Sequence, residues 1–447
     1  MMGLARDGGL ILPERLPAVD ENTLDGWQNL AYQYLAVEIL QLFIDDLDRR
    51  TLEGLVEDSY ASFRHPQVTP LRQVDDLYIL ELFHGPTLAF KDVALLLLGN
   101  LFAHQLEQSD SFMNIIGATS GDTGSAAIHG VRGKKRIHIF ILHPHNRTSP
   151  IQALQMTTVL DDNVFNIAVR GTFDDAQAVV KTLFNDLEFR DRYRLGAINS
   201  INWARVLAQV VYYVYSFLRL RRRGTTEVDF AVPTGNFGDI FAGYVARRLL
   251  PAGCIGKLIL ATNANDILSR FVSQGVYATT GEVTPTWSPS MDIQIASNFE
   301  RYLYYLRDGD GARVREDMER FAATGRLDLT DLADRVQEEF SAVRVSEEET
   351  LETIGTFARR YGYLLDPHTA VGVRAARQLR SGRPVICLAT AHPAKFGEAV
   401  LRATGREVEL PPALAKLEAM ETRCTFLDPD PGQIKEFIRQ HALTSHD

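Results

Sequence analysis

The segment Phe112-Met113-Asn114-Ile115-Ile116-Gly117-Ala118-Thr119-Ser120-Gly121-Asp122-Thr123-Gly124-Ser125-Ala126-Ala127 joins an apolar run to a turn rich in glycine and hydroxyl side chains. Its first part, Phe112–Gly117, has the length and composition of a buried strand. The small residues after the turn open a helix that can pack closely. A strand, a glycine turn and a helix in direct succession are typical of an α/β fold.

Six more apolar runs extend this pattern along the chain: Leu77–Phe83, Arg136–Leu142, Asn163–Val169, Val228–Pro233, Lys257–Thr262 and Val385–Thr390. Several are apolar at successive positions, which suits strands buried on both faces of a parallel sheet. Helical patterns lie between them. One is expected to begin after Ser200 as its N-cap, and another at Thr172 with acidic residues in its first turn. This alternation predicts a parallel sheet with helical crossovers.

Composition limits the classes of protein to which the chain can belong. A length of 447 residues predicts two or three domains, and a net charge of −10 argues against nucleic acid as a partner. The three cysteines, Cys254, Cys387 and Cys424, are too far apart for a metal motif or a disulfide framework. The most apolar run, Val93–Ala103, is too short to span a bilayer. We therefore expect a cytoplasmic protein without a membrane partner.

A lysine follows the first predicted strand, in His84-Gly85-Pro86-Thr87-Leu88-Ala89-Phe90-Lys91-Asp92. Apolar neighbours disfavour the ammonium form of a lysine, which an imine-forming amine requires. The alternative interpretation is a surface lysine that opens an amphipathic helix beside Asp92.

Three other segments follow predicted strands. The turn Gly117–Gly124 can bind an anion at a helix N-terminus, although its spacing is not the G-x-G-x-x-G of dinucleotide sites. The segment Pro233–Asp239 can present several backbone amides to one phosphate, and Thr390 lies at a strand's carboxyl end, where open α/β sheets bind ligands. Each also has a plain structural explanation as a turn or loop. Together with Lys91, they indicate a cofactor that carries its own phosphate and acts on an anionic substrate.

Three further strings, Asn199–Arg205, Ala261–Leu268 and Asp366–Gly372, complete a resemblance that runs through nearly the whole chain. The sequence resembles the threonine synthases, in the longer form found in fungi and many bacteria. The resemblance implies the tryptophan-synthase-β-like pyridoxal-phosphate fold (fold type II), in which two doubly wound α/β domains enclose the cofactor in a cleft.

The implied domains have approximate boundaries. Residues 1–70 would form a mostly helical N-terminal domain. Residues 71–100 and 200–447 would form a large cofactor-binding α/β domain with a helical insertion near 307–360, and residues 101–199 a small mobile α/β domain. Oligomeric state stays open between monomer and homodimer.

The resemblance also implies residues that bind pyridoxal 5'-phosphate. Lys91 would hold the cofactor as a Schiff base, with Phe90 beside it, and would act as acid and base. Thr390 would bond the pyridine nitrogen. The phosphate would be bound by Gly235, Asn236, Phe237 and Gly238, and Asp239 would be a further cofactor-binding residue.

The implied substrate is O-phosphohomoserine, which reacts with water to give threonine and phosphate. The residues implied to contact it are Thr119, Ser120, Asp122 and Thr123 for its carboxylate, Arg147 and Arg205 for its phosphate, and Asn199. A guanidinium suits phosphate because it offers two parallel donors, although Arg205 could equally be a helix-surface charge. Three histidines, His84, His368 and His392, could assist, but a structural role is commoner. His143 and His145 mimic a metal pair without a third ligand nearby, so no metal is expected.

Two alternative functions remain open. One is a threonine-synthase-like phospho-lyase that releases 2-oxobutyrate, and the other is a non-catalytic protein that binds pyridoxal phosphate. Two departures from the family pattern also stand out. A segment containing Ser-Thr-Arg-Gly is expected before Gly3–Gly9 and is missing, and Asn146 replaces a glycine before Arg147.

Overall fold

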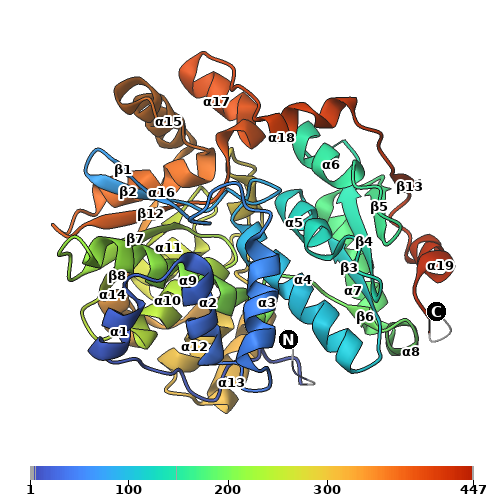
Figure 1. Ribbon diagram of the computed structural model, residues 1–447, viewed down its shortest axis with the longest axis horizontal. Coiled ribbons are helices and arrows are strands. Elements are labelled where there is room, and N and C mark those ends of the chain that lie inside the picture. The colour runs from blue at the N-terminus through green and yellow to red at the C-terminus, as the bar shows by residue number, and fades with distance from the viewer. Residues whose placement is uncertain (1–4, 6, 147, 445–447) are drawn as a thin grey trace. The chain divides into compact units, whose positions relative to one another are not determined.

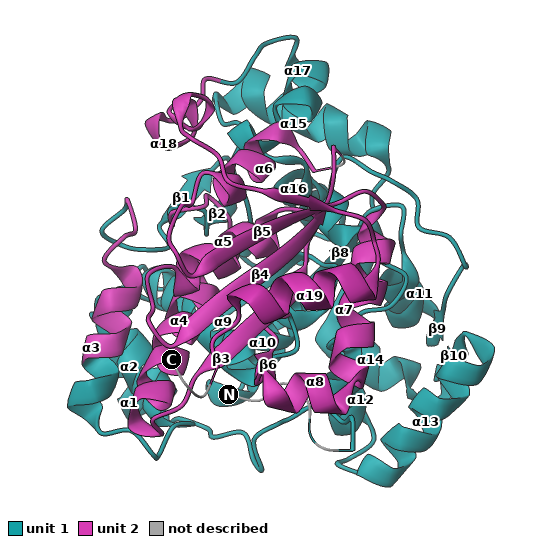
Figure 2. Ribbon diagram, turned by 90° about the vertical axis from the view of Figure 1, so that its right-hand side faces the viewer, with its two compact units in different colours: residues 1–53, 65–84, 200–408 teal, residues 54–64, 85–199, 409–447 magenta. Residues whose placement is uncertain are grey.

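The computed structural model describes residues 5, 7–146 and 148–444. Contacts divide the chain into two compact units, coloured separately in Figure 2. Unit 1 comprises residues 1–53, 65–84 and 200–408, and unit 2 comprises residues 54–64, 85–199 and 409–447. The sequence-based boundaries instead set residues 1–70 apart and kept 200–447 together.

Unit 1 is built on a six-stranded sheet in the order β1-β2-β12-β7-β8-β11. The antiparallel edge pair is β1 (Leu71–Val74) and β2 (Leu77–Glu81), and the other neighbours are parallel. The remaining strands are β12 (Val385–Ala389), β7 (Val228–Pro233), β8 (Ile255–Thr262) and β11 (Phe340–Arg344). The central strand β7 is buried at every position, as a sheet covered on both faces requires.

Helices cover both faces of this sheet (Figure 1). One face packs on α16 (Pro367–Gln378), which is covered in turn by α15 (Glu347–Tyr361), and α17 (Gly397–Thr404) lies against α15. The other face packs on α10 (Gly238–Leu249), followed by α9 (Trp203–Arg221) and α2 (Tyr32–Gln41). The other elements of the unit are α1 (Glu21–Trp27), α11 (Ile267–Gln274), α12 (Phe299–Leu306), α13 (Gly311–Thr324), α14 (Ala333–Glu339) and the small sheet of β9 (Val276–Ala278) and β10 (Arg326–Asp328).

Unit 2 is built on a parallel sheet in the order β13-β5-β4-β3-β6. Its strands are β13 (Thr425–Leu427), β5 (Val164–Val169), β4 (Ile137–Pro144), β3 (Met113–Ala118) and β6 (Leu195–Gly196). One face packs on α7 (Phe173–Asn185), α8 (Leu187–Arg192) and α19 (Pro431–His441), seen in front of the sheet in Figure 2. The unit's other helices include α3 (Arg49–Tyr60), whose first residues belong to unit 1, α4 (Lys91–Gln108), α5 (Asp122–Val131), α6 (Pro150–Thr157) and α18 (Pro412–Ala415).

The predicted α/β class and all seven predicted strands are confirmed, with ends that shift by no more than two residues. The helical character of the N-terminal region is also confirmed by α1, α2 and α3. The stretch expected to be a helical insertion holds α13, α14 and α15, and also the strands β10 and β11.

The predicted N-cap of α9 was wrong by two residues. Asn202 caps the helix, because its side chain accepts a hydrogen bond from the amide of Ala204 at 3.0 Å. The hydroxyl of Ser200 instead bonds that of Ser297 at 2.8 Å. The predicted start of α7 at Thr172 is confirmed, with a capping box between Thr172 and Asp175.

Every helix in the described part of the chain is either too short or too polar to span a bilayer.

Candidate active site

Lys91 is the first residue of α4 in unit 2, and the residue is only 8% exposed. It therefore opens a helix, as the surface interpretation supposed, but it is not at the surface. Leu88, three residues earlier, has a φ of 60°, which a branched residue adopts only under constraint. Such strain is typical of segments that present a reactive group.

Hydrogen bonds pin the turn that leads to Lys91. The carboxylate of Asp92 accepts from the amide and the hydroxyl of Thr87, at 2.8 and 2.6 Å. Arg64 donates to the carbonyls of Gly85 and Pro86, and Gln155 donates to the carbonyl of Thr87 at 2.9 Å. These hydrogen bonds therefore fix the backbone that carries the Lys91 side chain.

The second group in unit 2 is the turn between β3 and α5. The hydroxyl of Thr119 accepts from the amides of Gly121 and Gly124, at 3.0 and 2.9 Å. The carboxylate of Asp122 accepts from Gln152 at 2.7 Å, and both Thr119 and Asp122 are buried. Ser120 is exposed and Thr123 is half-buried. Thus the predicted residues share one turn, but Thr119 and Asp122 shape it while Ser120 and Thr123 are accessible.

Unit 1 carries the turn predicted to bind a phosphate. It connects β7 to the twelve-residue helix α10, whose N-cap, Phe237, has a φ of 63° and no side-chain cap. The amides at such a helix end have no intrahelical partner and favour an anion. Asn298 donates its amide and its side chain to the carbonyl of Asn236, both at 3.1 Å.

Gly235 leaves no room for a side chain, because a Cβ there would lie 2.7 Å from the carbonyl oxygen of Ser290. The ring of Phe237 is buried beside Phe299, Tyr302 and Phe340. Phe237 can therefore offer a ligand only its backbone. The turn fits the phosphate of the implied cofactor.

A buried polar cluster lies under the start of α10. The carboxylate of Asp239 accepts hydrogen bonds from the hydroxyls of Tyr212 and Tyr213 on α9. Burial raises the pKa of Asp239 to about 6, although the two hydroxyls and Arg205 oppose that rise. Sequence reasoning missed both tyrosines, since their apolar neighbours in α9 are typical of a core helix.

Arg205 is 5% exposed, and burial lowers its pKa to about 10. Its Nη1 atom has no hydrogen-bond partner among the described residues. Arg205 is therefore not the surface charge of the alternative interpretation. Of the other predicted residues, Asn199 is exposed in unit 2, and Arg147 lies outside the described residues.

Thr390 follows the end of β12, as predicted, and is 6% exposed. Its amide donates to the hydroxyl of Thr369 at 3.2 Å. The three histidines all have structural partners: His84 bonds Glu81 at 2.8 Å, His368 bonds Asp366 at 2.9 Å, and His392 accepts from the amide of Ala394 at 3.2 Å.

His143 is buried, and its Nε2 lies 3.7 Å from the sulfur of Cys424. Burial lowers the pKa of His143 to about 4. Within the described ranges, no group of three or more histidine, cysteine, aspartate or glutamate side chains is arranged to hold a metal.

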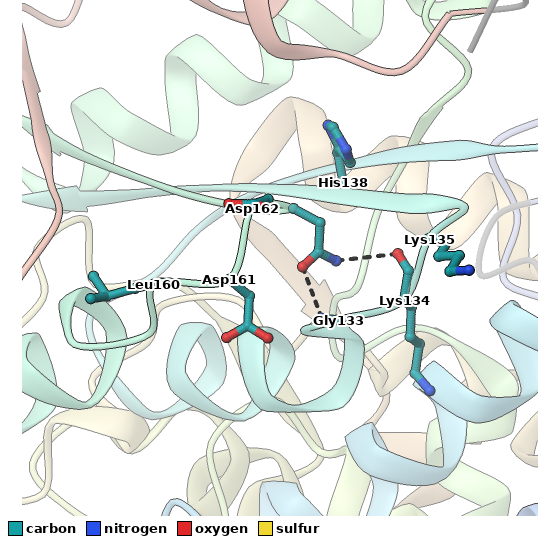
Figure 3. Close-up of a pocket in the computed structure, with 8 residues that line it drawn as sticks. Gly133, Lys134, Lys135, His138, Leu160, Asp161 and Asp162 are labelled. Carbon is teal, nitrogen blue, oxygen red and sulfur yellow. Dashed lines mark hydrogen bonds between the residues drawn. The ribbon is translucent and has the colours of Figure 1, made fainter.

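A hollow of about 500 Å³ in unit 2 is lined by charged side chains, including Lys134, Lys135, Asp161 and Asp162 (Figure 3). It lies where β4 and β5 begin, since Asn163 immediately precedes β5 and Lys135 lies two residues before β4. Thr119 and Ser120 lie at the opposite, carboxyl edge of the same sheet. The hollow is therefore separate from the predicted substrate turn.

Comparison with known families covers most of the chain. Residues 1–60 match the model "Threonine synthase N terminus", residues 63–331 match "Pyridoxal-phosphate dependent enzyme", and residues 369–438 match "Threonine synthase, C-terminal".

Individual relatives agree with these matches. A threonine synthase from Pseudomonas aeruginosa is 48% identical, across 99% of this chain and 94% of the relative. A human protein named threonine synthase-like 2 is 38% identical, across 95% of this chain and 90% of the relative. The crystal structure of a PLP-bound threonine synthase from Brucella melitensis has a TM-score of 0.95 and 46% identity, across 98% of this chain and 95% of that one. The chain belongs to the threonine synthase family of pyridoxal-phosphate-dependent enzymes.

Proposed function

We propose that the chain converts O-phospho-L-homoserine and water to L-threonine and phosphate with pyridoxal 5'-phosphate, as the last step of threonine biosynthesis. The main support for the proposal is that the chain offers both groups that such a cofactor requires: an amine for the covalent link and a binding turn for its phosphate. One is the buried Lys91 on a pinned turn, and the other is the uncapped N-terminus of α10 after a glycine turn.

Lys91 holds the cofactor, and its amine moves protons at Cα and Cβ of the substrate. The backbone of Gly235–Gly238 and the N-terminus of α10 hold the cofactor phosphate, and Phe90 lies beside the attachment point. The Thr390 hydroxyl would donate a hydrogen bond to the ring nitrogen, and as a neutral group it would not protonate that nitrogen. When bound, the cofactor supplies an electron sink for charge that develops on the substrate carbons.

The substrate carboxylate is received by the accessible side chains of the Thr119–Thr123 turn, at the N-terminus of α5. Asp122 serves this turn through its bond to Gln152. The substrate phosphate is bound by Arg205, with Arg147 and Asn199 as further ligands. The orphaned Nη1 of Arg205 supports that role, because a buried guanidinium donor without an acceptor is costly.

In the overall reaction, protons leave Cα and Cβ, phosphate leaves Cγ, and the hydroxyl of water adds at Cβ. Protons return to Cα and to Cγ, and the remaining proton is taken up by the released phosphate. A reducing, cytoplasmic location is part of the proposal, and it is supported by three cysteines that are all free.

The test incubates the purified protein with O-phospho-L-homoserine and quantifies threonine, 2-oxobutyrate and phosphate. We expect threonine and phosphate in equal amounts. A predominance of 2-oxobutyrate would establish the phospho-lyase, and the absence of both organic products from cofactor-loaded protein would establish a binding protein without catalysis.

A further inference from the structure

Asp366 makes more hydrogen bonds than a helix cap needs. It is the N-cap of α16 and is 1% exposed. Its Oδ1 accepts from the amide of His368 at 3.0 Å and from Nδ1 of the same residue at 2.9 Å. Its Oδ2 accepts from the amide of Thr369 at 3.3 Å and from the Thr369 hydroxyl. The carboxylate therefore fixes two side chains as well as the helix end.

The first of these side chains leads to Thr390. Because the Thr369 hydroxyl gives its only proton to Asp366, its lone pairs are left to accept from the amide of Thr390, at 3.2 Å. Both threonines are buried. Without the Thr369 oxygen, the Thr390 amide would lose its acceptor in a buried position.

The second side chain leads to the turn at Gly235. Since Nδ1 of His368 donates to Asp366, its Nε2 is free to accept, and the amide of Ser290 donates to it at 3.2 Å. The carbonyl of Ser290 is the group that a Cβ at Gly235 would meet at 2.7 Å. His368 therefore holds the segment that lies directly against this turn.

The same helix also contacts the strand that enters the turn. A Cβ at Gly372 would lie 3.2 Å from Cδ of Pro233, the last residue of β7. The segment Asp366–Gly372 thus makes contacts within unit 1 with Pro233 at the end of β7, with Ser290 beside Gly235, and with the backbone amide of Thr390.

We infer that Asp366, His368 and Thr369 are positioning residues that set two parts of the cofactor site through two branches that share Asp366. Thr369 places Thr390 at the pyridine ring, and His368 places the phosphate turn through Ser290. The inference rests on the proposed cofactor ligands, and it assigns a role to the motif Asp366–Gly372 that the reaction itself does not use.

The ring branch is tested with Thr369→Val, Thr369→Ser and Thr390→Val. Apo-protein is titrated with pyridoxal phosphate, and affinity and absorption spectrum are recorded along with urea unfolding. We expect Thr369→Val to weaken binding roughly tenfold and to shift the absorption spectrum in the same direction as Thr390→Val, since one lost hydrogen bond to a buried amide has that scale. Thr369→Ser should restore both. Thr350→Val is the matched control, because Thr350 is also buried and, among the described residues, its hydroxyl bonds the carbonyl of Ser346 within its own helix rather than the cofactor site.

The role of His368 at the phosphate turn is tested with His368→Ala, whose affinities for pyridoxal phosphate and for pyridoxal are compared. Affinity for pyridoxal phosphate should fall, whereas affinity for pyridoxal, which lacks the phosphate, should be unchanged. If both affinities fell together, the cause would be a loss of overall stability, and this result would contradict a role of His368 at the phosphate turn.

Two results overturn the inference in distinguishable ways. A changed spectrum in Thr390→Val with an unchanged one in Thr369→Val contradicts the positioning role and leaves the cofactor assignment intact. An unchanged spectrum in Thr390→Val contradicts the assignment of Thr390, and the ring branch falls with it.

Discussion

Asp239 shows how one buried side chain can couple the phosphate turn to pH. Its pKa is raised to about 6 from an ordinary 3.8 by burial, so the folded protein binds this proton more tightly than the unfolded chain. The contribution of Asp239 to stability is therefore full below about pH 4, falls as the pH rises to about 6, and is constant above.

We predict that Asp239→Asn removes this pH dependence, because the amide oxygen can still accept from Tyr212 and Tyr213 without titrating. The measurement is the free energy of unfolding in urea of the cofactor-free proteins, at about pH 5 and about pH 7.5. The wild type should lose stability relative to the variant at the higher pH. Asp334→Asn, at an exposed position, is the control, and equal pH dependence in wild type and Asp239→Asn would disprove the prediction.

Substitution of Arg205 can distinguish a role in substrate binding from a purely structural role. We predict that Arg205→Gln raises KM for O-phosphohomoserine at least about tenfold, since one charge-assisted contact to phosphate has that scale, and weakens inhibition by inorganic phosphate. Arg221→Gln, on the same helix but paired with Glu21 and Asp25, should change neither. A lowered melting temperature with an unchanged KM would show that Arg205 is only structural.

At this scale the sequence predicted which residues lie in the turns better than which way they point. The glycine pattern located the turn at Gly235–Gly238 but could not reveal that the Phe237 ring is buried against α12. In the same way, Thr119 and Asp122 lie in the predicted turn, yet their polar atoms bond its backbone and Gln152. Side-chain direction depends on partners far away in the chain, which a local motif does not encode.

Helix α10 depends on close contact between its preceding turn and the Ser290 segment. We predict that Gly235→Ala destabilises the protein by about 1–3 kcal/mol and weakens cofactor binding, because the new Cβ would meet the backbone carbonyl of Ser290 rather than a flexible side chain. Denaturant unfolding and cofactor titration check both effects.

The control for this prediction is Gly54→Ala. Gly54 lies within α3, and an added Cβ there meets nothing within 4 Å, so alanine should stabilise by about 0.5–1 kcal/mol. If both substitutions changed the free energy of unfolding by the same amount, the prediction that a Cβ at Gly235 is destabilising would be wrong.

Continuously apolar strands were predictable, and strands that are charged or have only two or three residues were not. The strand β7 is apolar enough to be recognised in isolation, whereas β11 lies in a charged region and β13 has only three residues. Both pair with strands distant in sequence, β8 and β5, and that pairing stabilises them. Their extended form is therefore a tertiary effect that local composition does not show.

For the molecule as a whole, the C-terminal residues return to unit 2. Strand β13 pairs with β5, Ile434 and Ile438 of α19 are fully buried in the same cluster as Phe140, and Asn114 bonds both the amide and the carbonyl of Leu443. The sequence-based boundaries kept residues 200–447 together, because nothing local marks this return.

We predict that Ile438→Ala destabilises the protein by about 2–5 kcal/mol, as a large-to-small change in a packed core does. Gln440→Ala, at an exposed position on the same helix, should lie within about 0.5 kcal/mol of the wild type. Thermal and urea unfolding compare them, and equal stability of the two variants would show that α19 is not part of this core.

We propose that Lys91 carries the cofactor in an enzyme that makes threonine. The most direct measurement traps the covalent link with borohydride in the cofactor-loaded protein and maps the modified peptide by mass spectrometry, with Lys91→Ala as the control. We predict a pyridoxyl group on Lys91, loss of threonine formation on reduction, and no modification in the control. A pyridoxyl group on another lysine, or threonine formation by Lys91→Ala at the wild-type rate, would contradict it.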